Sequence, residues 1–235
     1  MRNEQKLSEA VDGLLQSLGE RDPRVLVLRG SRDPSAVARL VHTVLVDRHC
    51  DVVTIRRALW LSGSYNNTDV IEAIMAMLRE RPELALNAGM ALERIGDRRM
   101  LEELGAIALD GHRSVECRHG AVRAIGGIAT AEAAKILSSV LLAPDENVAV
   151  LEAAINSLVY VQLKSGVSRS TSGLVRLIVS ESADVRYSVL VALGNLGARD
   201  QLEQIARLRN DHSLTSHGKE VGSEAERVIR LLGGE

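Results

Sequence analysis

The sequence predicts an all-α solenoid built from antiparallel helix hairpins, and three observations support this prediction. A helical phrase of small and apolar residues returns about every 33 residues, most regularly in Asp184–Gly197 (DVRYSVLVALGNLG). Polar or glycine-containing stretches separate these phrases from second apolar helices. The chain has no Phe, one Trp and three Tyr. Its core must therefore consist of Leu, Val, Ile and Ala, as thin interfaces between short helices require.

The repeated phrase can be followed through the chain by one anchor position. The anchors are Ala58, Ala91, Ala124, Ala154, Ala192 and Val228, so the steps are 33, 33, 30, 38 and 36 residues. A period in this range is typical of solenoids, in which each unit buries its apolar face only by stacking on its neighbours. We therefore expect about five to seven repeats, with the array spanning residues 51–235.

The first fifty residues match the phrase poorly. They predict helices near residues 4–19, 23–29 and 34–47. Asp22-Pro23 and Asp33-Pro34 each place an acceptor at a helix start, with proline in the first turn. We interpret residues 1–50 as a degenerate repeat that forms an N-terminal helical cap, because the end units of a solenoid must be atypical to stay soluble.

Each phrase is paired with a second helix. Apolar spacing predicts these helices at Asp69–Arg79, Asp97–Leu109, Ala131–Leu142, Leu174–Val179 and Arg199–Leu208. Glycine ends a helix without strain, and the expected stops are Gly19, Gly30, Gly63, Gly96, Gly111, Gly197 and Gly233. Longer loops are expected at residues 62–68, 164–173 and 212–223. The second loop lies inside the 38-residue step and accounts for it as an insertion.

Charge and cysteine content indicate which partners and which cellular compartment to expect. Acidic and basic residues are interspersed, and the net charge is −2. The sequence therefore predicts no strong positive electrostatic potential that would attract the phosphate backbone of a nucleic acid. Cys50 and Cys117 lie far apart in different repeats, which argues against a disulfide framework and fits a reducing compartment. The polar start lacks a signal-peptide core, and no stretch is long and apolar enough to span a membrane. We expect a soluble cytoplasmic protein without a membrane partner.

The regular phrase carries a family resemblance. Asp184-Val185-Arg186 followed by Ala192–Gly197 (ALGNLG) resembles the second helix of a HEAT repeat, of the short bacterial kind also found in phycobilin lyases. The resemblance covers residues 50 to 233 and is weak around Ala154 and Val228; Val148, for example, stands where the regular phrase has Arg186. It implies a right-handed superhelix in which the helices formed by the repeated phrase line the concave side. It also implies that Asp184 and Arg186 cap a helix and bridge adjacent units, but it leaves function open.

No metal site is predicted. The best cluster of candidate ligands is His112 with Cys117 and His119, with His49-Cys50 one or two repeats away. Zinc needs three or four ligands in tetrahedral geometry, and this spacing matches none of the standard patterns. Cys117 occupies a core position of the repeat, which favours a buried thiol. HEAT-repeat hydroxylases, which this fold resembles, require His-Glu pairs, and this chain has no His-Glu dipeptide.

No catalytic motif is predicted either. Gly120 with Gly126-Gly127 lacks the preceding strand and the Lys-Ser/Thr of a phosphate loop, so close helix packing is the favoured interpretation. The spacing indicates no Ser-His-Asp or Cys-His arrangement. We expect a non-enzymatic protein without a cofactor.

Nucleic acid is not the favoured partner. The helix segment Ile55–Trp60 (IRRALW) resembles the basic, aromatic concave face of bacterial alkylpurine DNA glycosylases, a HEAT-like group of about this length. A duplex binder neutralises several phosphates, whereas this chain has 29 basic and 31 acidic residues and no sustained basic run.

A ridge on the inner helices is the predicted binding surface. If Val185, Val189 and Leu193 face the core, then positions 187, 191 and 195 point the other way. Carried through the repeats, the ridge contains Val53, Arg57, Trp60, Leu61, Leu86, Met90, Glu93, Arg94, His119, Arg123, Asn156, Tyr160, Tyr187, Val191 and Asn195. Tyr65 lies in the loop after Trp60. Trp, Tyr and Arg dominate protein–protein hot spots, although half-buried packing between repeats is the alternative.

We interpret the chain as a protein-binding scaffold, adaptor or inhibitor of regulatory or immunity type. Its predicted binding residues are Arg57, Trp60, Tyr65, Met90, Arg94, His119, Arg123, Asn156, Tyr160, Tyr187 and Asn195. The arginines favour a partner with an acidic patch. The alternative is a lyase-like accessory protein that cradles a cofactor, for which a reactive Cys is expected in the groove. The sequence leaves homo-oligomerisation open.

Overall fold

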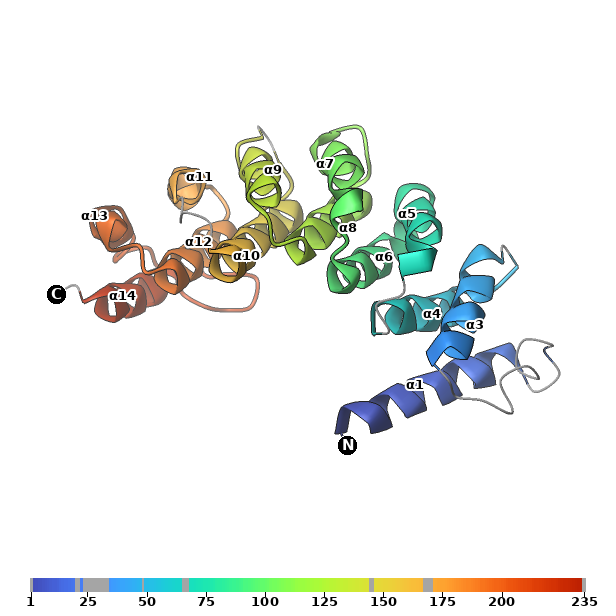
Figure 1. Cartoon of the computed structure of the whole chain (residues 1–235). Helices are drawn as coiled ribbons and strands as arrows, with labels where there is room; N and C mark the ends of the chain where they lie inside the picture. Colours follow the sequence, from blue (N-terminus) through green and yellow to red (C-terminus); the bar gives the residue numbers. More distant parts are fainter. Residues whose placement is uncertain are drawn as a thin grey trace.

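Helices stacked in two layers make up the described part of the chain (Figure 1). The computed structural model describes residues 2–19, 22, 34–47, 49–64, 68–143, 146–166 and 171–233. Within these ranges there is no strand, and the isolated antiparallel bridge between Leu214 and Glu220 is the β-type pairing present. This arrangement confirms the prediction of an all-α solenoid.

The inner layer contains the repeated phrases. Its helices are α1 (Arg2–Leu18), α4 (Val52–Ser64), α6 (Pro82–Ile95), α8 (Val115–Gly127), α10 (Val148–Ser165), α12 (Ala183–Leu196) and α14 (Val221–Leu232). Each packs against the next one in this order. The inner layer is therefore a continuous row along the length of the molecule.

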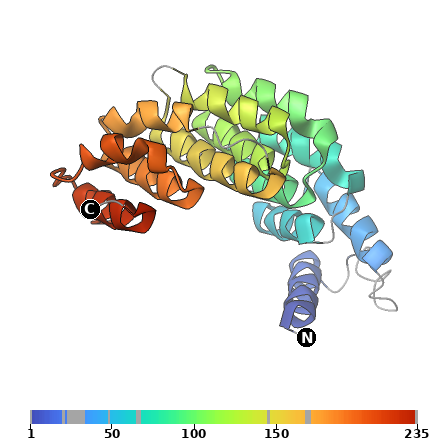
Figure 2. The same cartoon turned by 60° about the vertical axis from the view of Figure 1, so that its left-hand side comes forward.

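The outer layer contains the second helices. They are α3 (Pro34–Val46), α5 (Ile71–Glu80), α7 (Leu101–Leu109), α9 (Ala131–Leu141), α11 (Ser172–Arg176) and α13 (Leu202–Ala206). Short 3-10 turns extend several of them: Thr68–Val70, Arg98–Met100, Leu177–Val179 and Arg199–Gln201. Each outer helix packs on the inner helix that follows it in the chain. Figure 2 shows the stack as an arch, with the outer layer on the convex side and the inner layer on the concave side.

The anchor residues of the repeat lie in the core. Ala58, Ala124, Ala154 and Val228 have no exposed surface, and Ala91 and Ala192 are each 2% exposed. Small side chains at these positions let neighbouring inner helices approach closely, and the Leu, Val and Ile residues around them fill the space between layers. Of the predicted ridge residues, Leu61 is misplaced, because it is fully buried in this core.

Helices α6 and α8 pack closely through glycines. A Cβ atom on Gly89 would lie 2.6 Å from the Cα of Gly120, and one on Gly127 would lie 2.7 Å from the Cα of Glu93. No side chain fits at these distances. The glycines of α8 therefore serve helix packing, as the sequence predicts.

Most predicted helix stops are confirmed. Gly19, Gly96, Gly197 and Gly233 follow helices with positive φ angles. Gly63 is a wrong prediction, since it lies inside α4, where a Cβ atom would come within 3.2 Å of the Ala91 backbone. The five predicted second helices are all present. The predicted helix 23–29, its start at Asp22-Pro23 and the stop at Gly30 fall largely or wholly outside the described residues.

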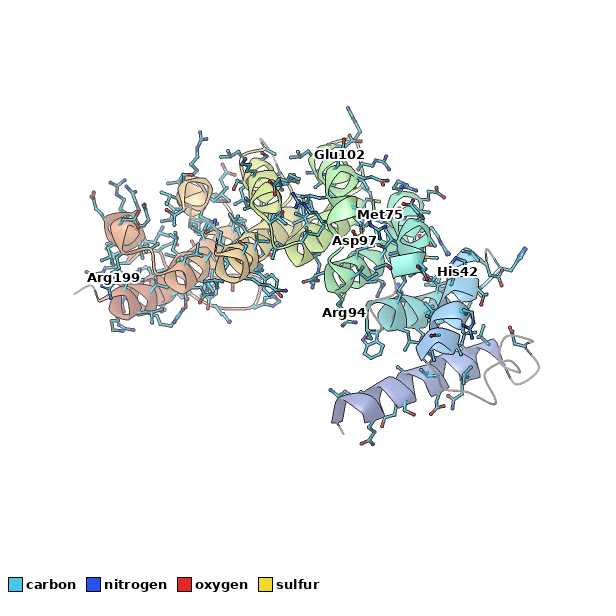
Figure 3. The ribbon with its side chains drawn as sticks, viewed as in Figure 1. His42, Met75, Arg94, Asp97, Glu102 and Arg199 are labelled. Carbon is cyan, nitrogen blue, oxygen red and sulfur yellow. The ribbon has the colours of Figure 1, made fainter. Side chains whose placement is uncertain are left out.

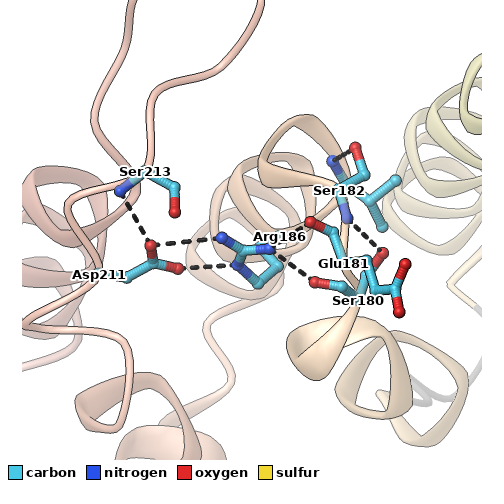
Figure 4. A network of polar contacts seen from close by, with 7 residues as sticks. Ser180, Glu181, Ser182, Arg186, Asp211 and Ser213 are labelled. Atoms are coloured by element: carbon cyan, nitrogen blue, oxygen red, sulfur yellow. Dashed lines mark hydrogen bonds and ion pairs between the residues drawn. The ribbon is translucent and has the colours of Figure 1, made fainter.

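Arg186 bridges adjacent repeats, as the resemblance implies (Figure 4). Its guanidinium donates to the Asp211 carboxylate at 2.7 and 3.3 Å and to the Ser180 carbonyl oxygen at 2.6 Å. The carboxylate of Asp184 also bridges, because it accepts hydrogen bonds from the amide and hydroxyl of Ser216. The capping role falls to Ser182, whose hydroxyl accepts from the Val185 amide. Asp184 is therefore not the capping residue.

Candidate functional site

The concave surface of α4 and α6 carries exposed large side chains. Val53 is 55% exposed, Trp60 38% and Leu86 41%. The Arg94 guanidinium lies over the Trp60 indole, 5.5 Å from the ring centroid. In Figure 3, Arg94 lies on the inner layer beside α4, on the opposite side of the stack from Glu102. This surface combines apolar area with a positive charge.

Arg57 is part of a contact between helices. Its guanidinium donates to the Gly13 carbonyl oxygen at 2.6 Å and to the Ser17 hydroxyl at 2.5 Å, and both acceptors belong to α1. The side chain joins α1 to α4, so fewer of its donors face a partner than the sequence suggests.

Helices α8 and α10 enclose a hollow on the same face. Its volume is about 370 Å³, and its lining includes His119, Arg123, Asn156 and Tyr160. Arg123 donates to the Glu93 carboxylate of α6 at 2.8 Å, an ion pair that crosses the α6–α8 junction. Four of the predicted residues are thus brought together here.

A second hollow of about 510 Å³ adjoins the first. Its lining includes Met90 and Arg94 from α6 and Lys164 from α10, and it shares Glu93, Arg123 and Tyr160 with the first hollow. The two hollows therefore form one continuous groove across α6, α8 and α10. Sequence reasoning missed Lys164 because that residue was assigned to a loop.

The predicted residues on α12 lie outside this groove. Tyr187 is half-buried against the core, with the Lys219 ammonium 5.3 Å from its ring centroid, and Asn195 is exposed. Neither residue lines the two hollows. Tyr65 lies outside the described residues.

The imidazole of His119 is the titratable group of the groove whose pKa is shifted. Burial lowers its pKa, and the positive charge of Arg123 lowers it further. Both effects disfavour the protonated form. The imidazole of His119 is accordingly neutral at neutral pH.

Both cysteines lie away from the groove. Cys117 is buried in the core, as its repeat position predicts. Cys50 is half-buried after α3, and its Sγ lies 3.5 Å from the Asp47 carboxylate. Across the described ranges, no three His, Cys, Asp or Glu side chains gather as metal ligands, and no helix is both long and apolar enough to cross a membrane.

Comparisons with known proteins support the fold. The sequence matches no protein-family model and no curated protein sequence. Two engineered proteins of known structure are similar to this chain, each at 19% sequence identity. The first has a TM-score of 0.53, and the match covers 95% of this chain and 68% of the engineered chain. The second has a TM-score of 0.50, and the match covers 95% of this chain and 97% of the engineered chain. A chain of the CpcE–CpcF complex of phycocyanin lyase from Nostoc sp. is also similar, at 17% sequence identity and a TM-score of 0.48. The match covers 95% of this chain and 93% of that chain. At these identities the likeness concerns the fold alone.

Proposed function

We propose that this protein is a non-enzymatic HEAT-like repeat scaffold, adaptor or inhibitor that binds a partner protein along its concave face. The observation that carries the proposal is the exposure of Val53, Trp60 and Leu86 on the neighbouring inner helices α4 and α6, with the Arg94 guanidinium over the Trp60 ring. The core is complete without them, since the inner helices stack through buried alanines, leucines and glycines. Large exposed side chains beside a groove are typical of binding surfaces.

The charges of the groove support a partner with acidic character. Arg94 and Lys164 lie over aromatic rings, and neither forms an ion pair with an acidic residue in the described part of the chain. Such cations attract an oppositely charged surface and accelerate association.

The alternative of a cofactor-cradling, lyase-like protein has less support. That function requires a reactive thiol at the ligand. Cys117 is buried and Cys50 packs beside Asp47, and neither lines the groove. Labelling of the native protein with a thiol reagent tests this alternative, because the alternative requires rapid stoichiometric labelling of Cys50 or Cys117.

Trp60→Ala tests the proposed function. The partner is first captured from the native host, identified by mass spectrometry and purified. Its affinity is then measured by calorimetry against wild type and variant. We expect a loss of ~2 kcal/mol or more, about thirtyfold in Kd, because a central Trp contributes that much to a hot spot.

The matched control is Arg79→Ala on outer helix α5, which should leave the affinity unchanged. Circular dichroism melting accompanies each variant, because Trp60 is only partly exposed. A Trp60→Ala protein that binds its partner with wild-type affinity per folded molecule would contradict the proposed binding face.

A further inference from the structure

Helix α10 is longer than the other inner helices of the array. In α6, α12 and α14 a glycine with positive φ ends the helix five residues after the buried anchor: Gly96 after Ala91, Gly197 after Ala192, Gly233 after Val228. In α10 the corresponding glycine, Gly166, comes twelve residues after Ala154. The helix therefore continues for about two further turns, roughly 10 Å. Insertions in a repeat array often map to the binding face.

The additional turns supply one wall of the second hollow. They carry Tyr160 and Lys164, which both line it. The Lys164 ammonium lies 5.2 Å from the centroid of the Tyr160 ring and donates to its hydroxyl at 3.1 Å. Tyr160 and Leu163 are each 49% exposed. The extension thus places an aromatic ring, an exposed aliphatic side chain and a cation at the rim.

Three cations from three successive inner helices face this hollow. Arg94 comes from α6, Arg123 from α8 and Lys164 from α10, and the lining contains one acidic residue, Glu93. Glu93 pairs with Arg123. Arg94 and Lys164 are instead held over the Trp60 and Tyr160 rings, contacts that leave their charges uncompensated.

We propose that this hollow binds an extended acidic segment of the partner protein, with carboxylate side chains placed against Arg94 and Lys164. This inference rests on the proposed protein-binding function. Trp60 lies against Arg94 of the hollow, and Leu86 lies one helical turn before Met90 of the hollow. Both are exposed and offer contact area to apolar residues that flank the acidic ones. The α10 extension is therefore the element that selects the charge of the partner.

The backbone around the hollow favours a peptide over a compact phosphate. Gly96 and Gly127 lie at the carboxyl ends of α6 and α8, where carbonyl oxygens and the negative end of the helix dipole face outward. Small phosphates prefer the amide groups of helix amino termini.

The test uses the full-length protein and a fluorescently labelled peptide of alternating Glu and Gly, followed by fluorescence anisotropy. Arg94→Gln and Lys164→Gln should each weaken binding about fivefold, and the double variant by about twentyfold. Lys219→Gln is the matched control, because Lys219 also lies over an aromatic ring but outside the groove. The Lys164→Gln variant keeps the length of α10, and its melting temperature verifies the fold.

Equal affinity for a Lys-Gly peptide, unchanged affinity in the double variant, or no measurable binding of the acidic peptide would overturn the inference. So would preferential binding of inorganic pyrophosphate, which would assign the hollow to a small anion. Binding of the purified natural partner separates the two proposals. If Trp60→Ala abolishes this binding and the double variant Arg94→Gln/Lys164→Gln retains it, the proposed binding face is supported and the proposed acidic segment is contradicted.

Discussion

Gly120 sets the distance between two repeats through the absence of a side chain. A Cβ atom there would lie 2.5 Å from the Ala85 carbonyl oxygen, and a backbone atom cannot move aside as a side chain can. We expect Gly120→Ala to lower the free energy of unfolding by ~1–3 kcal/mol, the usual cost of overpacking. Urea denaturation measures this change.

Gly13→Ala is the control for that prediction. Gly13 lies inside helix α1, and the nearest atom to its added Cβ would be Nε of Arg57 at 3.9 Å. Alanine is the better helix former, so this variant should gain up to ~1 kcal/mol. Equal losses in the two variants would indicate that α6 and α8 do not pack as closely as described.

His119 makes stability depend on pH. Its pKa is below the ordinary value of 6.5 in the folded protein, so the unfolded chain binds a proton more readily. Its stabilising contribution is present above pH 6.5 and is lost as pH falls from there toward the lowered pKa. We expect the unfolding free energy to fall more between about pH 7.5 and 5.5 in wild type than in His119→Gln.

Urea denaturation at the two pH values checks the expectation. Carboxyl groups with lowered pKa, such as Asp97 and Glu220, contribute stability above their ordinary values of 3.8 and 4.5 and lose it at lower pH. These carboxyl groups therefore titrate mostly below the interval from about pH 7.5 to 5.5, and they titrate alike in the wild type and in His119→Gln. Identical pH dependence in wild type and His119→Gln would show that the imidazole is solvated.

At the scale of elements, equivalent arginines join successive repeats. Arg118 and Arg186 both precede their anchor alanines by six residues. Each bonds to a carbonyl of the preceding segment and to an acid of the following repeat: Arg118 to Ala108 and Glu146, Arg186 to Ser180 and Asp211. The same bridge therefore recurs at two junctions.

Glu146→Ala should destabilise the α8–α10 junction. The Glu146 side chain is 2% exposed and that of Arg118 12%, so the variant leaves a largely buried guanidinium without its carboxylate. We expect a loss of ~3 kcal/mol in the free energy of unfolding, measured in urea. The exposed pair Arg207–Glu203 supplies the comparison: Glu203→Ala should cost below ~0.5 kcal/mol. Similar losses in both variants would contradict a buried pair.

At the scale of the whole molecule, each inner helix in the described part of the chain packs on the next inner helix in the stack. Leu193 of α12 is fully buried, and α12 packs on α10 and α14 in the inner layer. Leu193→Ala should cost ~2–5 kcal/mol and loosen those neighbours first, because repeats are coupled through their interfaces.

Hydrogen exchange followed by mass spectrometry measures this local effect. Protection should fall in α10, α12 and α14, with little change in α1 and α4. An equal rise in exchange near Ala10 and near Leu190 would indicate a single cooperative unit and would contradict the description of a repeat array.

The architecture was predictable from the sequence because its signals are local. Periodic alanines, glycine stops and apolar spacing determine which helices form and which face each one buries. The core position of Cys117 and the packing role of Gly120 and Gly127 follow from the same register. The extension of α10 was not predicted, although the late position of Gly166 signals it, because polar residues after Lys164 also fit a loop.

Only the tertiary structure decided which cationic side chains of the concave face remain available to bind a partner protein. Arg57, Arg94 and Arg123 occupy similar ridge positions in the sequence. In the folded chain Arg57 bonds to α1, 40 and 44 residues away, and Arg123 pairs with Glu93, 30 residues away. Arg94 keeps its charge over an indole ring. Hydrogen bonds and ion pairs depend on atoms from neighbouring helices, so periodicity determines the face of a side chain, whereas packing determines its partner.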